Sequence, residues 1–326
     1  MNGRMGKYLL VGLCFPLFWA ASALGQDFPS RPIEYIVGYP PGGVQDPQAR
    51  GLCKAAEKYL GQPLVVVNKP GVGGALALTY LASQKPDGYT IGQAAASCFN
   101  QIPFFEKVTY KIDDFCYIMG FGFHLHGLSV KADAPWKTFR EFLDYAKKNP
   151  GKVKYATYSP VSTTCMVMDL IAKEEGIDWT HIPYKGDGPA ITAILGGHGD
   201  AVAVAAGQVP YLRSGSLRLL AIFNSYNFKE FPNVPTLQSL GYKFPMLSTM
   251  TTYTGVLGPK GMNPAILKKL EDAFTEASKD PIFVNVMDSL SAPVVYKRGK
   301  ELHTEILNSY QIGEKIFPPI VAKMQR

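Results

Sequence analysis

The residues best suited to binding a small molecule form a glycine-containing turn near the start of the chain. An apolar segment, 35–37, runs into Tyr39-Pro-Pro-Gly-Gly43, and a helix signal follows at once, with Asp46 as capping residue and Pro47 at the first helical position. A strand that turns through glycines onto a helix N-terminus presents free backbone N–H groups and the positive end of the helix dipole. Such a turn suits an anion, phosphate or carboxylate, although it is equally common as a plain structural connection.

A second loop of this kind lies near the middle of the chain. The run Thr157-Tyr-Ser-Pro-Val-Ser-Thr-Thr164 opens a helical pattern that ends before Gly176. Ser162, Thr163 and Thr164 offer hydroxyls together with helix-start amides, from which a carboxylate can accept several hydrogen bonds. The structural alternative is ordinary N-capping by Ser162, which requires only one hydroxyl.

The elements that position these loops alternate along the chain. This alternation predicts an α/β architecture with largely parallel sheets. There is no long Pro/Gly/Ser-rich linker, which fits domains joined by several crossing strands. The expected strands are 33–37, 63–67, 89–93, 115–121, 127–130, 153–156, 201–205, 217–222 and 253–257, and the expected helices are 46–60, 74–83, 138–147, 163–175, 188–196, 264–278, 281–289 and 299–312.

The first 25 residues have the features of an export signal. Arg4 and Lys7 form a charged region, an apolar run covers 8–20, and Ala23-Leu-Gly25 supplies small residues for a cleavage site. We therefore expect a mature start at Gln26 and a periplasmic protein. The apolar run is too short for a membrane span, and no later segment has the necessary length and apolarity.

Charge favours an anionic small ligand over nucleic acid. Loss of Arg4 and Lys7 with the signal would lower the formal charge from +7 to +5, because no acidic residue leaves with them. The remaining basic residues form no cluster, so a nucleic-acid role is not expected. A mild positive excess would steer anions weakly.

The cysteines and histidines give no metal or redox signature. Cys53, Cys98, Cys116 and Cys165 match no zinc or C-x-x-C spacing, which leaves buried free thiols or one disulfide as open alternatives. His124 and His126 could share one face of a strand, but no carboxylate or cysteine nearby completes a ligand set. We expect no metal ion.

No enzyme motif stands out either. G-x-S-x-G, H-E-x-x-H and the P-loop are all missing, and Gly71-Val-Gly-Gly74 lacks the full dinucleotide spacing. We therefore expect a protein that is not an enzyme and that uses no cofactor. A secreted hydrolase with an unrecognised active site is the alternative.

Several short segments, in order along nearly the whole mature chain, together resemble one family. The chain is similar to the periplasmic substrate-binding receptors of tripartite tricarboxylate transporters, the Bug-type receptors. The segments are Phe28-Pro-Ser-Arg-Pro-Ile33, Ile36-Val-Gly-Tyr-Pro-Pro-Gly-Gly43, Asn68-Lys-Pro-Gly-Val-Gly-Gly74, Pro86-Asp-Gly-Tyr-Thr90, Asn149-Pro-Gly-Lys152, His181-Ile-Pro-Tyr-Lys-Gly186, Gly196-Gly-His-Gly-Asp200, Phe231-Pro-Asn-Val-Pro-Thr236 and Gly258-Pro-Lys-Gly261.

The resemblance implies a two-lobed, Venus-flytrap fold of the periplasmic binding-protein type, with the ligand in a cleft between the lobes. Domain 1 would comprise residues 26–128 and 247–326, and domain 2 residues 129–246. Typical ligands would be small organic carboxylates, including di- and tricarboxylates and aromatic acids, delivered by a monomeric receptor to an integral-membrane permease. A receptor that docks on a membrane signalling partner would have the same fold.

The resemblance also suggests which residues touch the ligand. In domain 1, Tyr39 would pack on it, while the backbone of Gly43, Val44 and Gln45 would donate to it. The remaining candidates are Ser97, Tyr158, Ser162, Thr163, Thr164, Gln208 and Tyr253.

Two places depart from the family pattern. The family usually has Gly and Ser over 158–161, where this chain has Tyr158 and Pro160. Some relatives carry an acid for an amino group where this chain has Ala206-Gly-Gln208. Because that segment contains no acid, we expect a ligand with a carboxylate and no essential ammonium group.

Overall fold

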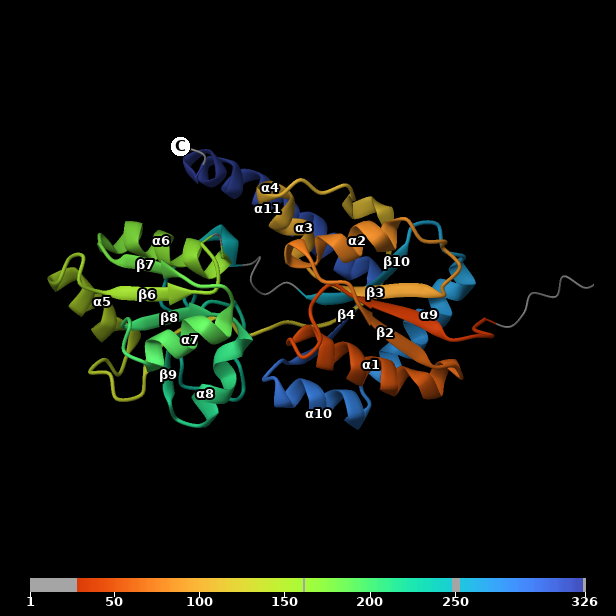
Figure 1. The fold of residues 1–326 in the computed structure, drawn as a ribbon, viewed down its shortest axis with the longest axis horizontal. Coiled ribbons are helices and arrows are strands. Elements are labelled where there is room, and N and C mark those ends of the chain that lie inside the picture. The colour runs from red at the N-terminus through yellow and green to blue at the C-terminus, as the bar shows by residue number, and fades with distance from the viewer. Residues whose placement is uncertain (1–27, 161, 248–252, 325–326) are drawn as a thin grey trace, which may run out of the picture.

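The computed structural model describes residues 28–160, 162–247 and 253–324, arranged as two lobes side by side (Figure 1). The expected signal segment 1–25, its cleavage site and Gln26 lie outside the described residues. We call the part built on the six-stranded sheet lobe 1 and the part built on the five-stranded sheet lobe 2.

Lobe 1 combines the beginning and the end of the described chain. Its sheet has the order β11-β4-β10-β3-β1-β2, made from β1 (Ile33–Val37), β2 (Leu64–Asn68), β3 (Thr90–Ala95), β4 (Phe115–Gly122), β10 (Thr254–Pro259) and β11 (Val294–Arg298). Its helices are α1 (Gln45–Leu60), α2 (Ala75–Ala82), α3 (Ser97–Asn100), α4 (Ile102–Phe105), α9 (Pro264–Ala277), α10 (Pro281–Ser289) and α11 (Gly299–Met324).

Lobe 2 is formed by the middle of the chain. Its sheet has the order β7-β6-β8-β5-β9, made from β5 (Gly127–Lys131), β6 (Lys154–Thr157), β7 (Thr180–Pro183), β8 (Ala201–Val204) and β9 (Leu217–Ile222). Its helices are α5 (Phe139–Lys148), α6 (Thr163–Glu175), α7 (Asp187–Leu195) and α8 (Val209–Arg213).

Local sequence signals explain where many helices begin and end. Gly61 ends α1 in the left-handed conformation, with φ of 72°, and its N–H bonds to the carbonyl of Glu57. Gly176 ends α6 in the same way, with φ of 66°. Asn263 and Asp280 cap α9 and α10, each followed by proline at the first helical position. These contacts are made within a few residues, so the sequence alone predicts them.

The sheets are mixed, whereas the alternation of elements predicted largely parallel sheets. In lobe 1, β1 pairs in parallel with β2 and β3, but β10 runs antiparallel between β3 and β4. In lobe 2, β6 pairs in parallel with β7 and β8, but β5 runs antiparallel between β8 and β9. The apolar pattern of a strand does not show in which direction it runs relative to its neighbours. The sequence also did not predict β7 and β11, because these strands are short or only partly buried and so have no clear apolar pattern.

The chain crosses between the sheets more than once. It passes from β4 to β5 through 123–126 and returns between β9 and β10, so the expected domain boundary at 128/129 falls inside β5. α11 continues well beyond the expected end at 312 and passes through Pro318. It thereby carries Phe317 into the apolar cluster of lobe 2.

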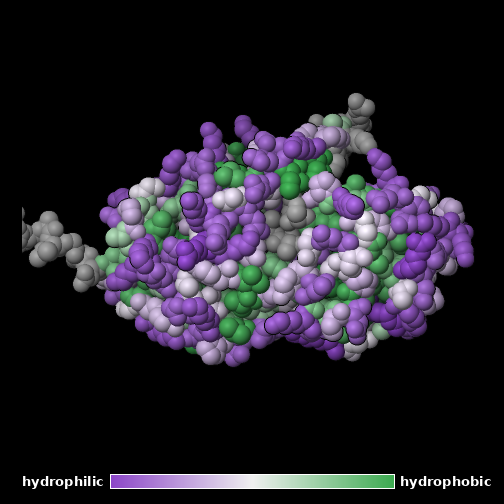
Figure 2. All heavy atoms as spheres, turned by 180° about the vertical axis from the view of Figure 1, so that it is seen from behind, coloured by the Kyte–Doolittle hydropathy of each residue, from purple (hydrophilic) through white to green (hydrophobic). Residues whose placement is uncertain are grey.

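Each lobe has its own apolar core, and a third cluster joins them. The lobe 1 core centres on β1, α1 and α9, and the lobe 2 core on β6, α5 and α6. The joining cluster includes Phe123 and Tyr253 beside the crossing segments, with Leu219 of lobe 2 and Leu302 of lobe 1. Seen from behind, the surface is mostly hydrophilic, with apolar residues in small separate groups (Figure 2). Among the described helices, none combines the length and apolarity that crossing a bilayer demands.

Candidate ligand-binding site

The candidate ligand loops lie at the carboxyl ends of parallel strands. In lobe 1 the loop at Tyr39–Gln45 follows β1 and Ser97 follows β3, while in lobe 2 the loop 158–164 follows β6 and the turn 206–208 follows β8. The carboxyl ends of β1 and β6 point toward one another across the middle of the molecule (Figure 1). Open α/β sheets bind their ligands at this edge.

The lobe 1 loop leaves two backbone donors free at the start of α1. Gly43 N–H bonds to the carbonyl of Pro40 at 3.2 Å, and Gly42 N–H bonds to Asp46 Oδ2 at 3.1 Å. By contrast, Val44 and Gln45 find no acceptor for their N–H groups among the described residues. Gly43 therefore shapes the turn, and the amides of Val44 and Gln45 remain for a ligand.

Tyr39 and Ser97 come together at this edge. The Tyr39 hydroxyl lies 3.9 Å from Cys98 Sγ and also hydrogen-bonds with the Ser97 side chain. Both Tyr39 and Ser97 are half-buried. Burial, followed by the neighbouring Cys98, raises the pKa of Tyr39 well above its ordinary value, so the phenol is neutral at physiological pH.

A buried amide network supports the loop from below. Gln93 Nε2 donates to both the backbone carbonyl and the side-chain Oε1 of Gln45, at 2.8 Å each. Gln45 Oε1 is thus the acceptor, and Gln45 Nε2 is left to donate to Thr254 Oγ1 at 3.4 Å and to His124 Nε2 at 3.2 Å. His124 Nε2 must then be the accepting nitrogen, which places the ring proton on Nδ1.

His124 is a residue that sequence reasoning considered only as a metal ligand. Its Nδ1 is buried and has no partner among the described residues. Burial, with His126 nearby, lowers the pKa of His124 to about 4, and burial lowers that of His126 to about 4 as well. Both rings are therefore neutral at physiological pH. In the described part of the chain, neither belongs to a cluster of metal-ligating side chains.

The lobe 2 loop engages all three of its predicted hydroxyls in hydrogen bonds of its own. Ser162 Oγ caps α6 by accepting from Cys165 N–H at 3.1 Å, and it lies 3.1 Å from Thr164 Oγ1. The exposed fraction of Ser162 is 2 % and that of Thr164 is 0 %. Thr163 is half-buried, and its hydroxyl lies 3.3 Å from Tyr158 Oη. Val161, in the same loop, lies outside the described residues.

Lobe 2 also has backbone donors at a helix start. Thr164 N–H finds no acceptor in the part of the chain that the structure describes, whereas the N–H of Thr163, the first residue of α6, hydrogen-bonds to the Tyr158 hydroxyl. Beside them, burial raises the pKa of Tyr158 to about 12, so this phenol is neutral too. Each lobe thus combines helix-start amides with one uncharged tyrosine, and in lobe 2 that tyrosine accepts from the Thr163 amide.

Two other predicted site residues lie deeper. Gln208 is fully buried, where Oε1 accepts from Ser129 Oγ at 2.6 Å and Nε2 donates to the carbonyl of Val204 at 3.0 Å. Tyr253 is buried in the apolar cluster that joins the lobes, with its ring 5.4 Å from that of Phe123. The structure therefore places both side chains in the protein interior, where they bond to or pack against other residues.

Asp187, the first residue of α7, lies at the same edge and was not singled out from the sequence. Its Oδ2 accepts from Gly207 N–H at 3.1 Å, and its charge acts on Tyr158. Burial raises the pKa of this carboxyl, and the bonds from the backbone of Gly207 and Ala205 only partly offset that effect. In the sequence, an aspartate at a helix start is indistinguishable from an ordinary first-turn acid.

A cysteine and a histidine come together in lobe 2 behind the loop. His181 Nδ1 lies 3.5 Å from Cys165 Sγ, and His181 Nε2 lies 2.7 Å from Thr157 Oγ1. Burial raises the pKa of Cys165 to about 12, which keeps the thiol protonated. An activated cysteine nucleophile requires the opposite shift. Cys53, Cys98, Cys116 and Cys165 are all free thiols.

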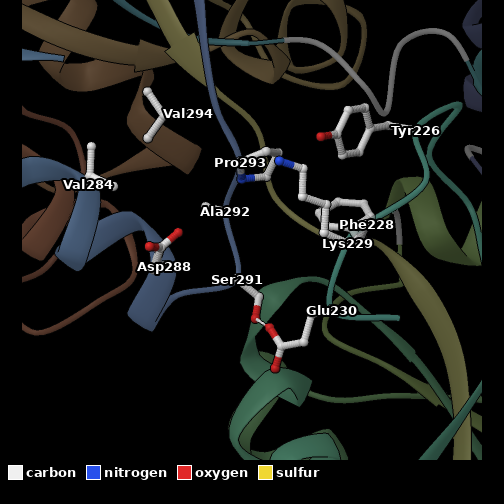
Figure 3. Close-up of a pocket in the computed structure, with 10 residues that line it drawn as sticks. All are labelled: Tyr226, Phe228, Lys229, Glu230, Val284, Asp288, Ser291, Ala292, Pro293 and Val294. Carbon is white, nitrogen blue, oxygen red and sulfur yellow. Dashed lines mark hydrogen bonds between the residues drawn. The ribbon is translucent and has the colours of Figure 1, made fainter. Parts of the chain in front are cut away.

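A cavity of about 310 Å³ opens elsewhere, between the segment after β9 and the α10–β11 connection (Figure 3). Glu230 points to Ser291 there, and Arg213 of lobe 2 links the two by donating to Glu230 Oε1 at 2.7 Å and to Ser291 Oγ at 2.8 Å. None of the predicted ligand residues lines this cavity. The lining carries both charges, with Lys229 beside Glu230 and Asp288, and its described residues show no group of free helix-start amides such as the loops described above offer an anion.

Known proteins with the same sequence pattern and fold are solute-binding receptors. The family model "Tripartite tricarboxylate transporter family receptor" matches residues 48–315. A UPF0065 protein from the gbd 5′ region of Cupriavidus necator is 39 % identical over 272 residues, which is 83 % of this chain and 81 % of that protein.

Comparison with solved structures leads to the same family. A TctC solute-binding protein from Polaromonas, determined without ligand, superposes with a TM-score of 0.75 at 30 % identity, covering 88 % of this chain and 98 % of that one. MatC from Rhodopseudomonas palustris, with bound malate, gives a TM-score of 0.67 at 25 % identity, covering 88 % and 100 %. With its two mixed sheets and this match over most of its length, the chain belongs to the tripartite tricarboxylate transporter receptor family of periplasmic solute-binding proteins.

Proposed function

We propose that this receptor captures a small organic carboxylate, a di- or tricarboxylate or an aromatic acid, between its lobes and delivers it to the permease of a tripartite tricarboxylate transporter. The observation that carries the proposal is the pair of helix starts at facing sheet edges. Val44 and Gln45 on lobe 1 and Thr164 on lobe 2 offer backbone N–H groups without a protein acceptor among the described residues, and beside them Thr163 N–H meets the Tyr158 hydroxyl. Backbone donors at a helix start favour a negative charge.

The side chains around these donors favour an organic acid. Tyr39 and Tyr158 are neutral at physiological pH, so neither phenol repels a carboxylate. Their rings add apolar surface on which the carbon skeleton of an acid can pack. The relative MatC is described with bound malate, a small dicarboxylate, which supports this ligand class.

The location follows from the same family membership. We propose that residues 1–25 direct export to the periplasm and are removed before Gln26. N-terminal sequencing of the exported protein would test the cleavage site. Co-purification of permease subunits with the receptor would distinguish transport from docking on a signalling partner.

The amides of α6 can be tested by a proline substitution that the local backbone allows. Ser162 has ψ of 148°, the extended conformation that a residue before proline prefers, and Thr163 is the first helical residue. Thr163→Pro therefore removes one N–H donor and the hydroxyl, whereas Thr163→Val removes the hydroxyl alone. We expect Thr163→Pro to weaken carboxylate binding by about tenfold or more in calorimetry, and Thr163→Val by less.

The same design applies to lobe 1. Val44 has φ of −56°, close to the value that proline fixes, so Val44→Pro removes a donor while Val44→Ala retains it. A panel of small organic acids would first be screened by thermal shift, to find acids that bind the wild type. A ligand at 100 times its Kd adds about 2.7 kcal/mol of stability. If both proline variants fold and bind acids as tightly as the wild type, the two-lobe carboxylate site is wrong.

Release of chemically unchanged ligand on denaturation would exclude the hydrolase alternative.

A further inference from the structure

Asp187 is an acidic side chain at the ligand edge of lobe 2 that lacks a cationic partner. It begins α7, and its Oδ2 meets Gly207 N–H at 3.1 Å, so the loops after β7 and β8 converge on it. Ion pairs elsewhere use acids such as Asp46, Glu175 and Glu230, but no lysine, arginine or histidine lies within 4 Å of Asp187 in the part of the chain described.

The glycine at position 207 makes this approach possible. A Cβ at Gly207 would lie 2.5 Å from Asp187 Cβ and 2.7 Å from its Oδ2. Both distances are shorter than real Cβ contacts, so any other residue would displace the carboxylate. The sequence thus brings an acid into the 206–208 turn from a different part of the chain. The segment 206–208 itself contains no acid, as its sequence says, but Asp187 from another part of the chain lies against it. The prediction of a ligand without an essential ammonium group therefore stays a prediction.

Asp187 is placed where a ligand can reach it. The side chain is half-buried, so it keeps some contact with solvent, and its charge acts on Tyr158 of the ligand loop. A largely desolvated carboxylate without a counter-charge is costly. Burial accordingly raises its pKa. A hydrogen-bond donor on a bound molecule would relieve that cost.

We propose that Asp187 is a specificity-determining residue. Its carboxylate accepts a hydrogen bond from a hydroxyl or an ammonium group on the part of the bound acid that reaches lobe 2. The proposal rests on the proposed carboxylate-binding function and names the class of ligand more closely. A carboxylate of the ligand occupies the helix-start amides, and the Asp187 carboxylate accepts from the substituent. Substituted acids are then preferred over unsubstituted acids of equal length.

The test is calorimetry with matched series at pH 7.5. Succinate, malate and aspartate share one skeleton with no donor, a hydroxyl or an ammonium, and glutarate, 2-hydroxyglutarate and glutamate repeat the set one carbon longer. We expect the wild type to prefer the hydroxy or the amino member over the unsubstituted acid. Asp187→Asn, whose amide oxygen still accepts from Gly207 N–H, should reduce that preference by about tenfold or more. Its affinity for the unsubstituted acids should stay equal or rise.

Two further variants control for charge and for position. Asp133→Asn removes the same charge from an exposed turn beyond the amino end of β8, and it should leave the preference unchanged. Gly207→Ala keeps the acid but displaces it, and it should reproduce the loss of preference. In ligand-free protein, Asp187→Asn should raise the thermal midpoint at pH 8, because a neutral amide replaces an uncompensated carboxylate.

The outcomes separate the two proposals. If unsubstituted acids bind and Asp187→Asn leaves the preference unchanged, the role of Asp187 is refuted while the receptor function stands. If the wild type binds no member of either series or of a wider acid panel, the carboxylate function itself fails, and the role of Asp187 fails with it. A lower thermal midpoint for Asp187→Asn in ligand-free protein would also count against an uncompensated charge.

Discussion

Asp46 and Asp187 occupy equivalent places in the two lobes and have opposite environments. Each lies in the first turn of a helix that follows a parallel strand. Asp46 accepts from Arg50 Nε at 3.0 Å, Asn68 Nδ2 at 3.0 Å and Gly42 N–H. Among the described residues, Asp187 accepts from the backbone of Gly207 and Ala205 and from no side chain.

The pKa values of the two carboxyls diverge for that reason. Burial opposes ionisation of both. For Asp46 the hydrogen bonds from Arg50, Asn68 and Gly42 together outweigh burial, and the pKa is lowered from its ordinary value of 3.8. For Asp187 burial prevails, and the pKa is raised. The acid of lobe 1 thus holds a loop in place through its hydrogen bonds, whereas the acid of lobe 2 is the one that we propose for ligand recognition.

The histidines beneath the lobe 1 loop give the largest expected effect. His124 and His126 have pKa values of about 4 when folded, below the ordinary 6.5, so the unfolded chain binds more protons between these values. Stability is therefore complete above pH 6.5 and falls as the pH drops toward 4, by on the order of 3 kcal/mol for each histidine. Urea unfolding across this range measures it.

The matched variant for this prediction is His124→Gln/His126→Gln. Carboxyl groups titrate in both proteins, so only the difference between their pH profiles reports the histidines. We expect the double variant to lose less stability between pH 6.5 and 4.5 than the wild type. Identical profiles would mean that the lobe 1 network is not held by neutral rings.

The matched substitutions Asp46→Asn and Asp187→Asn test the comparison directly. At pH 7 the first should lower the free energy of unfolding by about 2 kcal/mol, because Arg50, Asn68 and Gly42 lose a charged acceptor. The second should leave it unchanged or raise it. The contribution of Asp46 is present above its unfolded pKa and is lost as the pH falls through its folded pKa, so the deficit should shrink at acid pH. If both variants lost the same free energy of unfolding, the two aspartates would not differ in their contribution to stability as we expect.

The smallest effect separates a structural from an exposed hydroxyl within the lobe 2 loop. Ser162 caps α6 and is buried, so Ser162→Ala should cost about 1 kcal/mol of unfolding free energy. Thr163→Ala, one residue later, should cost less than about 0.5 kcal/mol, because its half-exposed hydroxyl only meets Tyr158. Thermal unfolding without ligand compares them, and a reversed order would contradict the assigned roles.

The sequence by itself determined the features that depend on neighbours a few residues apart. The start of α6 and the glycine ends of both helices follow from capping chemistry that acts within one helical turn. The predicted cap of α1 was wrong: the helix begins at Gln45 with Val44 as N-cap and no side-chain cap, so Asp46 lies inside the first turn. The resemblance also identified the family, since the ordered short motifs extend over most of the chain. Which amides of the lobe 1 loop are free was only partly predictable, because Gly43 N–H is already bonded to Pro40.

Only the tertiary structure decided which distant residues meet at the site. Gln45 reaches His124 and Thr254, which lie 79 and 209 residues away, and Asp187 reaches Gly207, 20 residues away. The strand directions of the mixed sheets and the burial of Gln208 were equally hidden, because periodicity reports which face is apolar and not which strand lies alongside. The charge state of a buried acid depends on its complete surroundings. Arg50, one turn along α1, and the distant Asn68 compensate Asp46, whereas no cationic side chain among the described residues pairs with Asp187.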